Sequence, residues 1–264
     1  METPDSFYFY EKRKFDSQEP YRCKLEWGVE GAIRAASRGD ILVIVDILSF
    51  STTTTYAVSQ GATVYPCTKT DDMESLAEKF HAKIAYSRTD AASKGIYSLS
   101  PITFDSISPG EAVILPSLNG SNCSRLCSDA PYVFIGSFLN VSAIADVIST
   151  LITKTDIDVT VVACGEREKK SNELRPAIED YLGAGAIIKK LTCEKSPEAL
   201  VCESAFEMNE NRVAELIWDS VSGRELRAIG FEDDVTFACK HDFVKTVPYI
   251  HQDAFVSYPS TTST

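Results

Sequence analysis

Five apolar residues and an aspartate, Ile41-Leu-Val-Ile-Val-Asp46, are followed by Ile-Leu-Ser49-Phe-Ser51-Thr52-Thr53-Thr54-Thr55. The apolar run predicts a buried strand over 41–45 that places the Asp46 carboxylate at its carboxyl end. The residues after it predict a turn and then a helix over 53–60, whose first N–H groups and hydroxyls could hold an anion. This stretch therefore suggests a site for a cation and a phosphorylated ligand.

The same succession of strand, polar turn and helix recurs along the chain. Further strands are expected over 63–66, 112–115, 132–135 and 159–163, with an edge strand over 243–248. Further helices are expected over 31–38, 71–80, 197–220 and 224–228, and from residues 122, 140 and 176 onward. This alternation predicts an α/β protein, layered α/β/α, with a largely parallel or mixed sheet. Ligands of such sheets bind at the carboxyl ends of the strands.

The chain of 264 residues, 44% of them hydrophobic, is long enough to bury a substantial core. We expect an amino-terminal arm over 1–24, a single α/β domain over 25–256 and a disordered tail over 257–264. The Ser- and Pro-containing stretch 86–110 interrupts the pattern, so two lobes joined there are an alternative to one continuous domain.

Composition and charge exclude several classes of protein. A formal net charge of −12, from 26 Lys and Arg against 38 Asp and Glu, argues against a nonspecific nucleic-acid-binding protein. The longest apolar run is too short to cross a membrane, and the segment 1–19 lacks the apolar core of a secretory signal. The eight cysteines are scattered, so we expect reduced thiols in a cytoplasmic protein. The three histidines form no triad or metal pattern, which disfavours a histidine-centred mechanism.

The first candidate site consists of Asp46 with Ser49, Ser51, Thr52 and Thr53. A carboxylate after a buried strand can hold Mg²⁺, a cation that is often shared with a substrate phosphate. The hydroxyls and the helix amino terminus could then receive the phosphate. The alternative, to which we give equal weight, is that Ser51 only caps the helix while the threonines pack against the sheet.

Two further polar turns follow other strands, Pro116-Ser117-Leu118-Asn119-Gly120-Ser121-Asn122 and Gly136-Ser137-Phe138-Leu139-Asn140. Asn-Gly tolerates positive φ, so a loop containing it can turn its N–H groups toward an anion. If the strand before the first turn neighbours the 41–45 strand, this turn would line the same site. The alternative for both turns is an ordinary strand-to-helix connection with a capping residue.

The fourth candidate region is rich in charge and contains Glu166, Arg167, Arg175, Glu179 and Asp180. Its carboxylates could bind a metal, and an arginine could clamp an anion through paired hydrogen bonds. The alternative is a salt bridge on one helical face, because Arg175 and Glu179 are four residues apart.

Taken together, four ordered segments resemble the 2-phosphosulfolactate phosphatase family, and the likeness covers about residues 25–250. The segments are Val45-Asp46-Ile47-Leu48 with the Ser/Thr run ending at Gly61-Ala62, Asn119-Gly120-Ser121, Gly136-Ser137-Phe138-Leu139-Asn140, and Glu179-Asp180 with Gly183-Ala184-Gly185-Ala186. Gly230-Phe-Glu-Asp-Asp234 and Val247-Pro248 are similar too. The resemblance implies an α/β fold peculiar to that family and Mg²⁺-dependent hydrolysis of a phosphate monoester on a small, strongly anionic acid.

The chain also departs from the family pattern. Where members typically read Asp-Val-Leu-Arg, this chain ends the motif with Ser49, so a cation that could hold the sulfonate or phosphate is missing. The segment 116–121 stands where Thr-Thr-Asn-Gly-Thr is common, and Arg175-Pro176 stands where Phe-Ser-Leu is more usual. Arg167 or Arg175 could compensate for the lost arginine. These departures leave the physiological substrate open.

We therefore expect a Mg²⁺-dependent phosphatase that acts on a small phosphorylated carboxylic or sulfonic acid similar to 2-phosphosulfolactate. Asp46, Glu166 and Glu179 are the expected catalytic residues, and the same three with Asp180 are the expected metal ligands. The expected substrate-binding residues are Ser49, Ser51, Thr52, Thr53, Asn119, Gly120, Ser121, Ser137, Asn140, Arg167 and Arg175. The nucleophile is either metal-activated water or Asp46 itself.

The alternative function is a family member that has lost catalysis with the arginine and only binds a small anionic or phosphorylated ligand. Neither nucleic acid nor a membrane is an expected partner. The oligomeric state is open, and a homodimer is one expected assembly.

Overall fold

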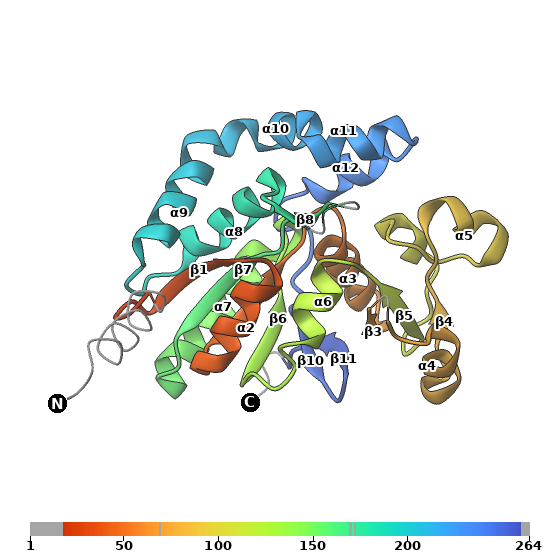
Figure 1. Ribbon diagram of the computed structural model, residues 1–264, viewed down its shortest axis with the longest axis horizontal. Coiled ribbons are helices and arrows are strands. Elements are labelled where there is room, and N and C mark those ends of the chain that lie inside the picture. The colour runs from red at the N-terminus through yellow and green to blue at the C-terminus, as the bar shows by residue number, and fades with distance from the viewer. Residues whose placement is uncertain (1–17, 69, 169–170, 172, 260–264) are drawn as a thin grey trace.

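The computed structural model describes residues 18–68, 70–168, 171 and 173–259 (Figure 1). Most of the predicted arm, residues 1–17, and the end of the predicted tail, residues 260–264, lie outside the described residues. The strands are β1 (Cys23–Trp27), β2 (Ile41–Val45), β3 (Thr63–Cys67), β4 (Lys83–Ile84), β5 (Ala112–Pro116), β6 (Tyr132–Ile135), β7 (Val159–Ala163), β8 (Glu166–Arg167), β9 (Leu174–Arg175), β10 (Pro248–His251) and β11 (Ala254–Ser257).

The helices alternate with these strands along most of the chain. They are α2 (Gly28–Arg38), α3 (Phe50–Ser59), α4 (Met73–Phe80), α5 (Arg88–Lys94), α6 (Gly120–Arg125), α7 (Val141–Thr155), α8 (Ile178–Lys190), α9 (Pro197–Asn209), α10 (Val213–Asp219), α11 (Val221–Ala228) and α12 (Glu232–Ala238). Short 3₁₀ turns lie at η1 (Pro101–Phe104), η2 (Phe138–Asn140) and η3 (Glu210–Arg212). No helix among the described residues is long and apolar enough to cross a membrane.

Nine strands form one mixed sheet in the order β1-β7-β2-β6-β10-β11-β3-β5-β4. β1, β7, β2 and β6 are parallel to one another, and so are β3, β5 and β4. The antiparallel hairpin of β10 and β11 joins these two sets through one residue pair on each side, Tyr249 with Phe134 and Phe255 with Val64. The predicted α/β class and mixed sheet are confirmed.

Strand β2 is buried on both faces, as its continuous apolar sequence predicts. Ile41, Val43 and Val45 belong to one hydrophobic core, which also contains buried residues of α7, α8 and α9. Leu42 and Ile44 belong to a second core with residues of α2, α3 and α6. Helices therefore cover both faces of the sheet, and Asp46 leaves the strand at its carboxyl end between the two layers.

Several elements differ from the sequence-based expectation. Helix α3 begins at Phe50, three residues before the predicted start, because the turn after Asp46 is tighter than expected. The stretch 86–110 contains the short helix α5, which Ser87 caps by accepting the N–H of Asp90. The predicted edge strand over 243–248 is wrong. The strand in this part of the chain is β10, which begins at Pro248 and lies inside the sheet instead of at its edge.

Charged side chains of β1, of α2 and of the residues before β2 and β7 are paired with one another. Lys24 Nζ lies 2.7 Å from the Asp158 carboxylate and 3.6 Å from that of Asp40. Arg38 Nε lies 2.9 Å from Asp40, and its Nη1 lies 3.3 Å from Glu26. We call these five residues the basal ion-pair network, because they join β1, α2, β2 and β7 at the base of the sheet.

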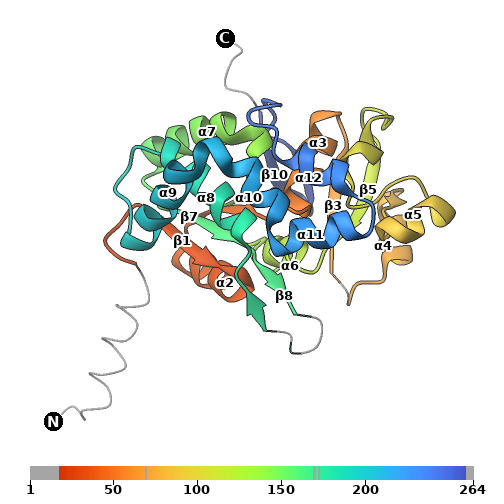
Figure 2. The same ribbon diagram turned by 90° about the horizontal axis from the view of Figure 1, so that it is seen from above.

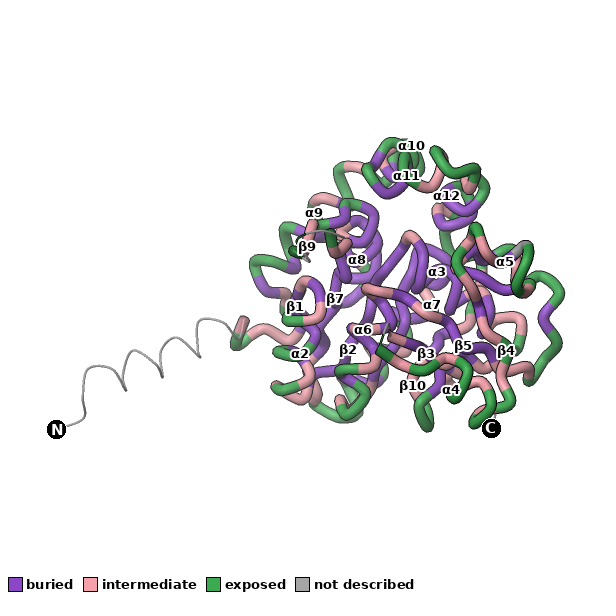
Figure 3. Tube along the Cα trace, turned by 45° about the vertical axis from the view of Figure 1, so that its right-hand side comes forward, coloured by how far each residue is buried: buried purple, intermediate pink, exposed green. Residues whose placement is uncertain are grey.

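A row of helices from α9 to α12 crosses the opposite end of the molecule. It starts beside β1 and reaches α12 near α3 (Figure 1), and the view from above shows that it overlies the sheet (Figure 2). The strands form the buried centre, whereas this row is exposed along much of its length (Figure 3). The row places Asp234 of α12 against Arg88 of α5, where the two form an ion pair of 2.7 Å.

Candidate active site

Asp46 lies at the point where the turns after β2 and β5 meet. Its side chain is buried, with 4% of the residue exposed. Oδ1 accepts the N–H of Phe50 at 3.2 Å, and Oδ2 accepts the N–H of Gly120 at 2.8 Å. The two turns therefore converge, as the sequence suggested, although β5 does not neighbour β2 and belongs to the other set of parallel strands.

Gly120 permits this approach because it has no side chain. A Cβ at this position would lie 2.3 Å from Phe50 Cδ1 and 2.9 Å from Asp46 Oδ2, well inside van der Waals contact. Ser117, in the same turn, places its hydroxyl 3.5 Å from Asp46 Oδ2. The Asn-Gly turn thus holds the Asp46 carboxylate through its backbone.

Asp180, near the start of α8, ties two other turns together. Its Oδ1 accepts the N–H of Ile47 at 2.7 Å, and its Oδ2 accepts the N–H of Gly165 at 2.9 Å. Each carboxylate oxygen therefore already has a backbone donor. In this arrangement Asp180 positions the turns after β2 and β7, and its predicted part in metal binding stays a prediction.

Glu166 and Glu179 complete a group of four acidic residues, which we call the acidic cluster: Asp46, Glu166, Glu179 and Asp180. Asn119 Nδ2 donates to Glu166 Oε2 at 3.1 Å, which links the turn after β5 to β8. Glu179 is only 2% exposed. Its Oε2 and the Oδ1 of Asn119 are buried and have no hydrogen-bond partner among the described residues. Two oxygen acceptors at this cluster are therefore open to a cation or a donor.

Burial and neighbouring carboxylates raise the pKa values of Asp46, Glu166 and Asp180. Burial, followed by the charge of Glu166, raises the pKa of Asp46 from 3.8 to about 7, although the N–H groups of Gly120 and Phe50 act in the opposite direction. Burial, and then the charges of Asp46 and Glu179, hold the pKa of Asp180 well above its ordinary value. Burial also raises the pKa of Glu166, against the hydrogen bond from Asn119. A cation would relieve this repulsion.

The donors of the cluster suit a hard cation, but they form no complete cage. Among the described residues, no three acidic, histidine or cysteine side chains are arranged as a ready set of metal ligands. Mg²⁺ usually needs only one or two carboxylates, with water and substrate phosphate filling its other positions. The unpartnered Glu179 oxygen and the raised pKa of Asp46 fit such a partial site.

The hydroxyls predicted to receive phosphate point to main-chain carbonyl groups in this structure. Their acceptors are the carbonyl oxygens of Ile44 for Ser51, Ile47 for Thr52, Leu99 for Thr53 and Leu115 for Ser121. All four hydroxyl residues are at most 1% exposed. They brace the turns around Asp46, and their role in phosphate binding stays a prediction.

Ser137 and Asn140 form a reciprocal capping arrangement in the turn after β6. Asn140 Oδ1 accepts the N–H of Ser137 at 3.0 Å, and Asn140 Nδ2 donates to the carbonyl of Thr246 at 3.1 Å. Both residues are fully buried. This is the capping alternative considered for the turn, and binding of substrate by these two residues is untested.

The predicted arginines lie around β8 and β9. Arg167 Nη2 lies 2.8 Å from each carboxylate oxygen of Glu30. Arg175 lies opposite Glu166 in the antiparallel register of β8 and β9. Its Nη2 donates to Ser222 Oγ at 3.2 Å. The described residues contain no ion pair between Arg175 and Glu179, the alternative suggested by their spacing. A clamp by either arginine stays a prediction.

A cation that the sequence did not single out lies beside Ser49. Arg88 Nη2 is 2.5 Å from Ser49 Oγ and 2.9 Å from the Leu99 carbonyl, and Arg88 Nε is 2.7 Å from Asp234 Oδ2. The stretch containing Arg88 has no periodic pattern that would have drawn attention to it. Its partner Asp234, however, belongs to the Gly230–Asp234 segment that carried part of the family resemblance.

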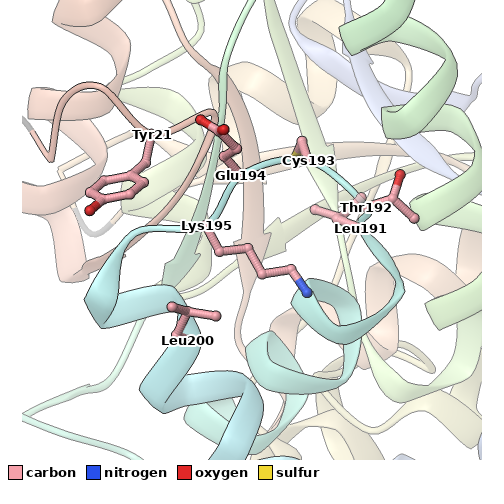
Figure 4. A pocket seen from close by; sticks show the side chains of 7 residues that line it. All are labelled: Tyr21, Leu191, Thr192, Cys193, Glu194, Lys195 and Leu200. Carbon is pink, nitrogen blue, oxygen red and sulfur yellow. The ribbon is translucent and has the colours of Figure 1, made fainter.

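A separate hollow of about 470 Å³ lies between the start of β1 and the connection of α8 to α9 (Figure 4). Tyr21, Cys193, Lys195 and Leu200 are among its lining residues. Its one lysine is already bound by Glu203, with Nζ–O distances of 2.7 and 2.8 Å. The hollow contains none of the predicted site residues, so the candidate site remains the one around Asp46.

Comparison with known proteins shows to which family the chain is similar. A family model described as 2-phosphosulpholactate phosphatase matches residues 29–253. A 2-phosphosulfolactate phosphatase of Methanocaldococcus jannaschii is 29% identical over 218 residues, which cover 81% of this chain and 91% of the relative. A protein of Thermotoga petrophila, named probable 2-phosphosulfolactate phosphatase, is 30% identical over 219 residues, 81% of this chain and 90% of the relative. The matched range includes the whole acidic cluster.

Proposed function

The chain belongs to the 2-phosphosulpholactate phosphatase family, a family of phosphoric monoester hydrolases, and we propose that it is a Mg²⁺-dependent phosphatase. Its substrate would be the phosphate monoester of a small anionic hydroxyacid that resembles 2-phosphosulfolactate. The observation that carries this proposal is the acidic cluster at the carboxyl ends of β2 and β7, in which burial and mutual repulsion raise the pKa of Asp46 to about 7.

The all-oxygen donor set indicates which side chains would hold the cation. Asp46, Glu166 and Glu179 are the proposed ligands, and Glu179 Oε2 is the oxygen without another partner among the described residues. Bound Mg²⁺ would neutralise charge on the phosphoryl group and lower the pKa of a bound water. Asp180 would act by holding the backbone of Ile47 and Gly165, which fixes the turns that present the other carboxylates.

Asp46 is the residue on which the chemistry depends. The N–H groups of Phe50 and Gly120 fix both oxygens of its carboxylate, and Asn119 connects the adjoining turn to Glu166. Such a fixed carboxylate can act as the nucleophile or can position a metal-activated water. Rapid quenching with phosphate-labelled substrate separates the two routes, because attack by Asp46 gives a hydroxylamine-sensitive phosphoprotein and attack by water gives none.

The proposal is tested by phosphate release from a panel of phosphorylated hydroxyacids, including 2-phosphosulfolactate, in Mg²⁺ and in excess chelator. We expect release from at least one acid in Mg²⁺ and its loss in chelator. No metal-dependent release from any of them would overturn the proposal. If the same acids then still raised the melting temperature, the protein would be a family member that binds a phosphorylated acid without hydrolysing it, the alternative that the replacement of arginine by Ser49 suggests.

A further inference from the structure

The substrate class proposed above has two anionic ends, the phosphate ester and an acid group, and both must enter a site that is itself acidic. Mg²⁺ can neutralise only the part that it contacts. A second cation near the acidic cluster would hold the acid group, and the Ser49 position does not supply one. The described residues offer three arginines around this region, Arg88, Arg167 and Arg175.

Arg88 is held in one orientation by three hydrogen bonds. Its Nε donates to Asp234 at 2.7 Å, while Nη2 donates both to Ser49 Oγ and to the Leu99 carbonyl. Its Nη1 has no hydrogen-bond partner among the described residues, and the side chain remains 11% exposed. A guanidinium fixed in this way presents two unused N–H donors without having to lose conformational freedom on binding.

Ser49 places a hydroxyl group beside the Arg88 guanidinium. Its oxygen accepts from Arg88, and no acceptor for its own hydroxyl hydrogen is present among the described residues. The next residue, Phe50, donates its N–H to Asp46. The free donors of Arg88 and Ser49 therefore lie beside the backbone that holds the proposed catalytic carboxylate.

Helix α12 fixes Arg88 from the other side. Asp234 is 2% exposed and accepts Ser100 Oγ at 2.5 Å as well as Arg88. The ring of Phe231 lies 5.6 Å from the guanidinium carbon of Arg88. The row of helices that ends in α12 is thus connected to the site through a buried carboxylate whose two oxygens are both used.

The other two arginines are less suited to an acid group. Arg167 is bound by both oxygens of Glu30, so its charge is already matched by a carboxylate of α2. Arg175 lies opposite Glu166 in the register of the two short strands, and its charge partly offsets the rise that burial causes in the pKa of that carboxyl, which places Arg175 with the proposed metal ligands. Arg88 also has a carboxylate partner, but that contact uses Nε and leaves the Nη1 edge open.

We propose that Arg88, oriented by Asp234, binds the acid group that the substrate carries beside its phosphate ester, and that Ser49 donates its hydroxyl to the same group. This inference rests on the proposed phosphatase function and assigns the substrate's second anion to named residues. A carboxylate or a sulfonate oxygen can accept from Nη1 and from the Ser49 hydroxyl together. In this chain, a cation from α5 supplies the contact that the Ser49 position lacks.

The test compares Arg88→Met with the unchanged enzyme on two substrates, one phosphorylated hydroxyacid that the enzyme hydrolyses and p-nitrophenyl phosphate, which has no acid group. We expect the KM for the hydroxyacid to rise about 10- to 100-fold, the size typical for loss of a charged hydrogen bond. The kcat/KM for p-nitrophenyl phosphate should fall by a much smaller factor, because this substrate has no acid group for Arg88 to bind. Arg212→Met, which removes an exposed arginine paired with Glu215, is the matched control and should alter neither substrate.

Two further variants keep the test decisive if Arg88→Met folds poorly. Arg88→Lys retains the charge without the fixed fork, so its KM for the hydroxyacid should lie between those of the other two proteins. Asp234→Asn weakens the orientation of Arg88 and should raise the same KM by a smaller factor. An equal loss on both substrates, or no change in KM for the hydroxyacid, would overturn the proposal. Failure of the unchanged enzyme to hydrolyse any monoester would instead refute the proposed function.

Discussion

The two ends of the sheet bury similar charges in opposite ways. Around the amino ends of β2 and β7 and the neighbouring strand β1, the basal ion-pair network matches the carboxylates of Glu26, Asp40 and Asp158 with Lys24 and Arg38. At the carboxyl ends of the same strands, the acidic cluster collects four carboxylates and leaves one Glu179 oxygen without a partner among the described residues.

The difference separates charges that support the fold from charges that support function. A buried ion pair with complete hydrogen bonding keeps its charges, and removal of one partner strongly destabilises the protein. Buried like charges instead oppose folding and persist where a ligand or a cation makes use of them. Replacement of a carboxylate by an amide should therefore have opposite consequences at the two ends.

The largest effect is expected from Asp46→Asn at the acidic end. The amide has nearly the same shape but can neither attack phosphorus nor carry the charge that holds a cation. We expect kcat for phosphate release to fall about 1,000-fold or more, which corresponds to about 4 kcal/mol. Steady-state assays in saturating Mg²⁺ measure it, and circular dichroism checks the fold. Activity within tenfold of the unchanged enzyme would exclude Asp46 from catalysis.

The same chemical change at the basal end, Asp40→Asn, should affect stability instead of chemistry. Asp40 contacts Lys24 and Arg38 and accepts the Thr160 hydroxyl at 2.7 Å. Its loss should lower the free energy of unfolding by about 3 kcal/mol, measured by urea denaturation. The kcat of the folded protein should not change. A stable variant with reduced kcat would reverse the contrast between the two ends.

Gly120→Ala tests whether the turn after β5 must approach Asp46 closely. The added methyl group would collide with the Phe50 ring and crowd Asp46 Oδ2. We expect kcat to fall about 10- to 100-fold, since displacement of a reacting group by about 1 Å has effects of this size. Ser106→Ala is the control, because Ser106 is an exposed residue in the loop before β5. A similar loss of activity in both variants would show a general effect on folding.

Glu179→Gln should increase stability by a small amount. It removes one of the charges that raise the pKa values of Asp46 and Asp180, an effect of about 1 kcal/mol for buried groups at moderate separation. Urea denaturation at pH 7 in the absence of Mg²⁺ measures the gain. A loss of stability would mean that the Glu179 carboxylate has a favourable partner in the fold.

The pH dependence of this gain has a defined sign. The Asp46 carboxyl ionises near its ordinary pKa of 3.8 when the chain is unfolded, but the native carboxyl keeps its proton up to a pKa of about 7. Between these values the native state binds more protons, so the raised pKa makes the free energy of unfolding fall as the pH rises. Glu179→Gln lowers the pKa of Asp46 and should flatten this slope. Equal slopes in the two proteins would contradict the proposed repulsion.

The local parts of the structure followed from the sequence. The run Ile41–Val45 predicted its strand and the position of Asp46 correctly, because continuous apolar sequence and a terminal carboxylate are local signals. The turn at Asn119 was also placed correctly after a strand. The sequence also suggested that the strand before this turn, β5, could lie next to β2, and it does not. The hairpin of β10 and β11 stands between the two sets of parallel strands, and no local pattern encodes this order.

The contacts that define the site depend on distant residues and could not be predicted. Asn119 and Glu166 are 47 residues apart, and Arg88 and Asp234 are 146 residues apart. The early start of α3 also turned the Ser51 and Thr52 hydroxyls toward the carbonyls of β2 and its turn. Hydroxyl content alone could not distinguish this bracing from phosphate binding.

The most direct test of the contrast between the two ends is the melting temperature at pH 7.5 with increasing Mg²⁺. Binding to the native state alone raises stability with the logarithm of ligand concentration. The unchanged protein and Asp40→Asn should therefore show the same upward shift, whereas Asp46→Asn and Glu179→Gln should show a clearly smaller one. No shift in the unchanged protein, or an equal shift in all four proteins, would contradict the assignment of the acidic cluster as the cation site.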